Sequence, residues 1–193
     1  MSQSVVDLQK LLNKNGANLN TDGDLGNLTK GAIDKLNIPI WLKIAMKEIG
    51  TKEISGYKHN SRVIEYHSIS GGFTTDEVPW CGSFVNWVLR KSGISTTVPY
   101  PARALSWLKF GVQSKPITGT VAIKSRAGGG HVGFVVATSG SYVWILGGNQ
   151  SNEVNIRKYL ISDFKEYRAP TVFEVNKYKQ LVSIDTQVSG SEA

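Results

Sequence analysis

The hydrophobic pattern of this chain changes its period once, near residue 111, and this change constrains the fold more than any other feature. Before it, apolar residues recur every three or four positions, which is typical of amphipathic helices. The predicted helices span residues 4–14, 29–36, 41–49, 61–67, 81–92 and 102–110. After it, short segments rich in Val, Ile, Tyr and Phe predict strands. The predicted strands span residues 120–124, 131–138, 142–147, 154–159 and 167–173. Helices followed by strands indicate an α+β fold with an antiparallel sheet.

The size and the cysteine content of the chain exclude several classes of protein. Its 193 residues suffice for one domain, or for one domain with a small appendage, and 40% of them are hydrophobic. The only cysteine is Cys81, so an intrachain disulfide and a four-cysteine zinc site are excluded. His59 and His67 lack the paired spacing of a zinc site shared with Cys81 or His131. We therefore expect no metal and no cofactor.

The chain is basic, with 22 Lys and Arg against 15 Asp and Glu and a net charge of +7. This balance favours an anionic partner, whether nucleic acid, an anionic membrane or an acidic wall polymer. The basic residues are scattered and no nucleic-acid-binding motif is present, so no nucleic-acid partner is expected. No apolar run approaches the roughly 18 residues of a membrane span, so we expect no stable membrane insertion. We expect a monomer.

Cys81 is placed where a helix is predicted to begin, at the start of residues 81–92. The N-terminal end of a helix carries partial positive charge, which stabilises a thiolate and lowers the pKa of a cysteine there. Such a thiolate can attack a carbonyl, while the free N–H groups of the first helical turn hold the resulting oxyanion. Cys81 is also in register with the apolar stripe of Phe84, Val85 and Val88, so a small buried residue is the alternative interpretation.

Two further segments carry residues that would complete a nucleophilic site. His131 follows three glycines at the mouth of a predicted strand, and Gly130 beside it leaves room for a substrate backbone. A three-residue turn at 139–141 would place Asn149 opposite His131 on the next strand, whereas a two-residue turn would require a bulge to do so. A carboxamide there can accept the imidazole N–H and fix its tautomer. A cysteine, a histidine and an asparagine in this order are the arrangement of papain-like cysteine hydrolases.

Residues 41–170, about two thirds of the chain, resemble the CHAP/NlpC-P60 group of cysteine peptidoglycan hydrolases from bacteria and phages. The resemblance rests on residues 53–56, Asn60, and residues 76–81, 84–87, 104–107, 130–134 and 146–150. It implies a papain-like fold that cleaves an amide of peptidoglycan, with Cys81 as nucleophile, His131 as base and Asn149 as the third polar group. Many CHAP domains carry a Glu two residues before that Asn. Here the position is Gly147, so Asn149 is expected to orient the base alone.

The resemblance implies a phage-type endolysin whose partner is bacterial peptidoglycan, cutting as either an amidase or an endopeptidase. Residues 1–10 lack the features of a secretory signal, so we expect the protein to stay in the host cytoplasm until a separate pore releases it. An effector injected by a secretion machine or carried in a virion is equally compatible. A wall-binding module with an inert thiol is the non-enzymatic alternative.

The expected organisation has three parts: residues 1–38, a catalytic domain at 39–175, and a polar tail at 176–193 whose end is disordered. Residues 5–36 resemble the first part of a peptidoglycan-binding repeat, which indicates either wall binding or a packing appendage. An EF-hand is the competing interpretation of residues 18–29, but Asn18 and Thr29 stand where acidic calcium ligands are needed.

Three of the residues that precede Cys81 in the sequence are candidates for substrate contacts. Asp76 and Glu77 carry carboxylates that can bind an ammonium group of the stem peptide, although they can also be ordinary loop charges. Trp80 is expected to form a wall of the cleft.

Overall fold

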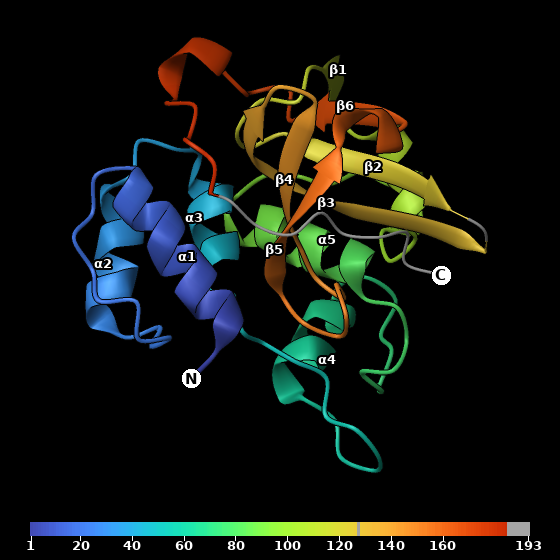
Figure 1. Cartoon of the computed structure of the whole chain (residues 1–193). Coiled ribbons are helices and arrows are strands. Elements are labelled where there is room, and N and C mark those ends of the chain that lie inside the picture. The colour runs from blue at the N-terminus through green and yellow to red at the C-terminus, as the bar shows by residue number, and fades with distance from the viewer. Residues whose placement is uncertain (127, 185–193) are drawn as a thin grey trace.

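The computed structural model describes residues 1–126 and 128–184 (Figure 1). Its helices are α1 (Gln3–Lys14), α2 (Asn27–Lys35), α3 (Ile40–Met46), α4 (Ser61–Ser68) and α5 (Cys81–Lys91), with 3-10 helices η1 (Ala104–Lys109), η2 (Ile161–Asp163) and η3 (Val175–Lys177). Its strands are β1 (Val112–Ser114), β2 (Val121–Arg126), β3 (Gly129–Ser139), β4 (Tyr142–Gly147), β5 (Asn155–Leu160) and β6 (Glu166–Ala169). The predicted α+β class is confirmed.

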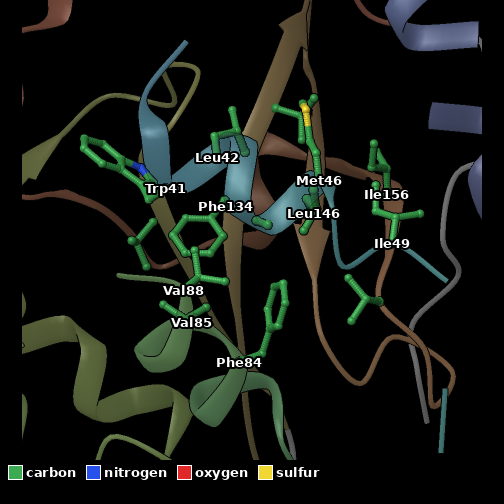
Figure 2. Packing of buried hydrophobic residues seen from close by; sticks show 14 of the residues in the cluster. Trp41, Leu42, Met46, Ile49, Phe84, Val85, Val88, Phe134, Leu146 and Ile156 are labelled. Atoms are coloured by element: carbon green, nitrogen blue, oxygen red, sulfur yellow. The ribbon is translucent and has the colours of Figure 1, made fainter. Parts of the chain in front are cut away.

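The strands form one antiparallel sheet in the order β1-β6-β2-β3-β4-β5, so β2 to β5 are a continuous meander. Helix α5 packs on β3 and β4, and α3 and α4 pack on α5. Figure 2 shows Phe84, Val85 and Val88 of α5 meeting Phe134 of β3 in the buried core. The amphipathic stripe read from residues 81–92 therefore anchors the helix that begins at Cys81.

The turn between β3 and β4 differs from the expected three-residue loop. Ser139 pairs with Tyr142, so the turn has two residues, and Gly140 takes the left-handed conformation with φ 55°. A bulge between Val135 and Ala137 then shifts the pairing, and Phe134 comes opposite Leu146. The bulge restores, close to the site, the register that the longer turn would have produced.

The N-terminal segment packs on the same core as the rest of the protein. Leu8, Leu11 and Leu12 of α1 are fully buried in the cluster that also contains Cys81, and α1 contacts β5. Figure 1 shows α1 and α2 side by side at one side of the molecule, next to α3. The apolar stripe predicted in residues 4–14 is therefore covered by the protein itself.

The first part of the expected polar tail, residues 176–184, contacts the core at two positions. Leu181 and Ile184 are buried in the core, and Leu181 forms an isolated parallel bridge with Ala137. The Asn15 side chain makes two hydrogen bonds with the backbone of Val182: Nδ2 donates to Val182 O, and Oδ1 accepts from Val182 N. Two apolar residues within a polar stretch therefore anchor it. The remainder of the predicted tail, 185–193, lies outside the described residues.

Other differences are local. Residues 104–109 form a 3-10 helix in place of the α-helix expected at 102–110, and the short strand β1 had no clear pattern in the sequence. Strand β6 ends before Pro170 because proline cannot continue the hydrogen-bonding pattern. Among residues 1–126 and 128–184, no helix combines the length and hydrophobicity needed to cross a membrane.

Candidate active site

Cys81 is the first residue of α5 and lines a pocket whose volume is about 790 Å³. Its side chain is only 6% exposed. The first hydrogen bond of the helix runs from Phe84 N to Trp80 O at 2.9 Å, so the thiol stands at the helix N-terminus as predicted. Gly82 follows it, and a Cβ there would lie 2.4 Å from Ala102 O. The glycine thus lets the 101–102 backbone close one side of the pocket against the helix.

His131 is buried near the start of β3, and its Nε2 lies 3.2 Å from Oε1 of Gln150. The orientation of the Gln150 amide is fixed, because its Nε2 donates to the backbone oxygen of Asn155 at 2.8 Å and to that residue's Oδ1 at 2.9 Å. The Tyr159 hydroxyl donates to the same Oε1 at 3.0 Å. Since this oxygen only accepts, His131 must donate Nε2–H, which leaves the lone pair on Nδ1.

The space that Gln150 fills is left by a missing side chain at Gly147. A Cβ at Gly147 would lie 2.9 Å from His131 Nε2 and 3.2 Å from Cδ of Gln150. Gly147 is thus the position on β4 that faces the imidazole. The carboxamide of Gln150 lies over this glycine. The hydrogen-bond acceptor for His131 is therefore supplied by residue 150 rather than by residue 147.

The amide of Asn149 bonds to groups other than His131, contrary to the expected pairing. Strand β4 ends at Gly147, and Asn149 takes the left-handed conformation with φ 56°. In the orientation that satisfies both ends of its amide, the nitrogen donates to Glu53 Oε1 at 3.2 Å and the oxygen accepts from Trp80 N at 3.3 Å. Asn149 therefore ties the loop after β4 to the residue that precedes Cys81.

The Cys81 thiol lies against β3, where the backbone N–H of Val132, the residue after His131, faces it. Burial raises the pKa of Cys81, while the N–H groups of Val132 and Gly82 and the charge of Arg126 oppose that rise. The expectation of a lowered thiol pKa is wrong in sign, because desolvation outweighs the helix N-terminus. Within the described residues, no hydrogen bond joins the thiol to the His131 ring.

The imidazole is neutral at physiological pH. Burial and, after it, the positive charge of Arg126 together lower the pKa of His131 to about 4, although the hydrogen bond that His131 donates to Gln150 acts in the opposite direction. Both members of the candidate pair are therefore uncharged in the free protein. A proton transfer between them creates two charges, so it requires a polar or charged group to favour the product.

Two of the candidate substrate contacts are internal. The buried Asp76 carboxylate accepts hydrogen bonds from Ile54 N at 3.0 Å and Asn60 N at 2.8 Å, and contacts His59 Nδ1 at 2.9 Å. These bonds lower the pKa of Asp76 even though burial raises it, so the carboxylate organises its loop rather than facing the pocket. Trp80 is fully buried and donates Nε1–H to Glu53 Oε1 at 2.7 Å, so it is a core residue and not a cleft wall.

Gly130 lines the pocket, and Glu77 is exposed but does not line it. Arg103, Lys109, Arg126 and Gln150 are the residues that sequence reasoning missed. For Gln150 the sequence did hold a signal. Gly147 stands where many CHAP domains have a Glu, and two adjacent carboxamides, Asn149 and Gln150, follow it as possible acceptors for the histidine.

Residues 73–149 match the CHAP domain family. This span contains Cys81, His131 and the sheet strands between them. The chain carries a CHAP domain. Members of the CHAP family are generally amidases or peptidases that act on peptidoglycan, and the family assignment made from the sequence motifs is confirmed. No curated protein matches the chain.

Among residues 1–126 and 128–184, no group of three or more His, Cys, Asp and Glu side chains lies close enough together to hold a metal ion. His67 instead places Nδ1 3.0 Å from the Ser83 hydroxyl inside the core.

The raised thiol pKa predicts slow alkylation of the CHAP domain cysteine. Because burial disfavours the thiolate, the rate of reaction with iodoacetamide should rise only above the ordinary thiol pKa of about 8.5. Intact-mass spectrometry from pH 6 to pH 10 measures this directly, since Cys81 is the only thiol. Arg126→Gln should move the midpoint to higher pH and Lys10→Gln, on α1, should not. A full reaction rate already at pH 6 would contradict a raised pKa for Cys81.

Proposed function

We propose that this protein hydrolyses an amide bond of the peptidoglycan peptide, with Cys81 as nucleophile, His131 as base and Gln150 as the residue that positions the base. The observation that carries the proposal is the hydrogen bond from His131 Nε2 to Gln150 Oε1, in a CHAP domain whose pocket is lined by Cys81. It fixes the tautomer that leaves Nδ1 able to take a proton.

The reaction begins with transfer of the Cys81 thiol proton to His131 Nδ1. The thiolate attacks the carbonyl carbon of the scissile amide, and the oxyanion is held by free backbone N–H groups in the first turn of α5. The tetrahedral intermediate collapses, the C–N bond breaks, and His131 protonates the leaving amine. The product is a thioester between Cys81 and the acyl part of the peptide.

Water completes the cycle. Nδ1 of His131 takes a proton from a water molecule, whose oxygen attacks the thioester carbonyl. The C–S bond breaks, the carboxylic acid product leaves, and the thiolate recovers the proton from the imidazolium. Throughout, Gln150 Oε1 accepts the Nε2–H bond, which strengthens when the ring is charged. The thiol and the ring must come into hydrogen-bond contact when the peptide binds, a tightening that is common between substrate-free and substrate-bound sites.

Asn149 has a structural part in this proposal rather than the orienting part. Its amide joins Glu53 to the backbone N–H of Trp80, one residue before the nucleophile. Gly148 beside it has no room for a side chain, because a Cβ would lie 2.6 Å from the Trp80 ring. The loop after β4 therefore fixes the position of the start of α5.

A wall-binding module with an inert thiol is the second candidate, favoured by the 6% exposure of Cys81. We place the enzyme first because an isolated structural cysteine gives no reason for a buried histidine held by a buried glutamine. We also propose the endolysin setting: a cytosolic lytic enzyme released to the wall by a separate pore, or delivered by a secretion machine or a virion.

Replacing the nucleophile tests the proposal against the binding-module alternative. Cys81→Ala should lose wall lysis, measured as loss of turbidity of purified bacterial walls, and should still bind the walls in a sedimentation assay. Thermal unfolding shows whether the variant is folded. Equal lysis by the wild-type protein and Cys81→Ala would exclude the proposed nucleophile.

The two adjacent carboxamides can be separated by substitution. Gln150→Met keeps the size of the side chain but removes the acceptor, so kcat/KM should fall by about 10- to 100-fold, as for other residues that orient a reacting histidine. Loss of this hydrogen bond further lowers the pKa of His131, so the acid limb of the pH profile of kcat/KM should move to lower pH.

Asn149→Ala is the matched control for that experiment. Because Asn149 acts on the loop before Cys81, this variant should leave the acid limb in place even where stability falls. The reverse result, a displaced limb in Asn149→Ala and an unchanged one in Gln150→Met, would restore Asn149 as the orienting residue.

A further inference from the structure

The pocket at Cys81 is lined by basic side chains from two separate parts of the fold. Arg103 precedes η1, Lys109 ends η1, and Arg126 ends β2. Among the lining residues that the structure describes there is no Asp or Glu. The charged side chains that line the pocket are therefore basic, although the nearest loop, before Cys81, is acidic in sequence.

The backbone around Arg103 is fixed by neighbouring groups. The Trp107 indole donates Nε1–H to Pro101 O at 2.9 Å, and Arg103 N donates to Tyr100 O at 2.9 Å. The guanidinium of Arg103 lies over the Tyr100 ring, 4.9 Å from its centroid. Stacking on one face of a guanidinium leaves its edge N–H groups available for a planar anion.

The backbone conformation of Tyr100 supports a role for this turn in binding. Its φ is 52°, in the left-handed region that a bulky side chain rarely takes, and its side chain is 70% exposed at the pocket. Such strain persists where the surroundings impose it, and it is concentrated at binding sites. Here it presents the ring beneath Arg103.

Arg126 approaches the same pocket from the β2–β3 hairpin. It pairs with Gly129, and its charge acts on both the Cys81 thiol and the His131 ring. An anion that sits against Arg126 is therefore close to the reacting groups. Lys109 adds a third positive charge on the η1 side.

We propose that this pocket binds a carboxylate of the peptide substrate, held between Arg103 and Arg126, and that the enzyme therefore prefers peptides with free carboxylates to their amidated forms. This inference rests on the proposed peptidoglycan hydrolase function and extends it to substrate selection. A guanidinium pairs with a carboxylate through two parallel N–H···O bonds, which an amide cannot reproduce.

The other lining residues favour a peptide as the bearer of the anion. Phe73, Val78, Pro79 and Leu105 give the pocket apolar walls beside its charges. Small aliphatic side chains of a peptide can pack there, whereas a phosphodiester backbone would leave these walls uncovered. The expected recognition of an ammonium group by Asp76 and Glu77 is unsupported, since neither carboxylate lines the pocket.

The test measures binding without turnover, using Cys81→Ala. Two synthetic peptides are titrated by calorimetry at low salt: N-acetyl-L-alanyl-γ-D-glutamyl-L-alanyl-D-alanine and the same peptide with both carboxyls converted to carboxamides. The acid should bind at least about 10-fold more tightly, as expected for a charge-assisted pair. Adding Arg103→Gln or Arg126→Gln should reduce the preference to below about 3-fold, the effect of one lost charge-assisted bond. Adding Lys10→Gln, which removes a charge on α1, should preserve it.

Equal affinity for the two peptides, or no measurable binding of the acid, would overturn the carboxylate site. Preference that survives Arg103→Gln and Arg126→Gln would overturn the assignment of these residues. Wall lysis by the wild-type protein is measured separately. Lysis with equal peptide affinities refutes only the carboxylate site, whereas a carboxylate preference without any lysis refutes the hydrolase.

Discussion

The hydrogen bond between Gln150 Oε1 and His131 Nε2 is the interaction on which the candidate site depends. Gln150 is completely buried, and every polar atom of its amide has a partner in β4, β5 or β3. Asn155 also returns a bond from its Nδ2 to Gln150 O at 2.8 Å. A buried network that is fully satisfied is rigid, because breaking any member leaves an unpaired polar group. The sheet thus sets the tautomer of the imidazole.

This arrangement gives the proposed base a hydrogen-bond acceptor although no acidic residue stands at position 147. A carboxylate there would raise the pKa of His131 by its charge. Burial and the positive charge of Arg126 lower the pKa of His131 to about 4, and the neutral Gln150 adds no negative charge to oppose them. A substrate carboxylate placed against Arg126 would offset that charge and favour the imidazolium formed during the reaction. Substrate recognition and activation of the base are then linked through one arginine.

Much of the fold followed from the hydrophobic pattern. The change of period separated helices from strands, and the stripe of Phe84, Val85 and Val88 located the helix that carries Cys81. Residues 181 and 184 were missed because two isolated apolar positions in a polar stretch have no period to detect. The 3-10 form of η1 was also missed, because apolar spacing does not distinguish it from an α-helix.

The site was harder to predict than the fold, because it depends on where side chains point at the end of a strand. The pairing register set by the turn placed Asn149 opposite His131, but that register applies only while the strand continues. Asn149 lies in a left-handed turn, and it is the neighbouring carboxamide, Gln150, that bonds to His131. The prediction of a lowered pKa for the Cys81 thiol failed for a similar reason. The sequence indicates the helix N-terminus, but it does not show how strongly the thiol is desolvated.

The protonation state and tautomer of His131 test this account most directly. Long-range ¹⁵N–¹H correlation spectra of ¹⁵N-histidine-labelled protein, with the signal assigned by comparison with His131→Gln, report both. The account predicts a neutral ring with the proton on Nε2 at pH 6 and a titration midpoint near pH 4. An imidazolium at pH 6, or a neutral ring carrying its proton on Nδ1, would contradict it.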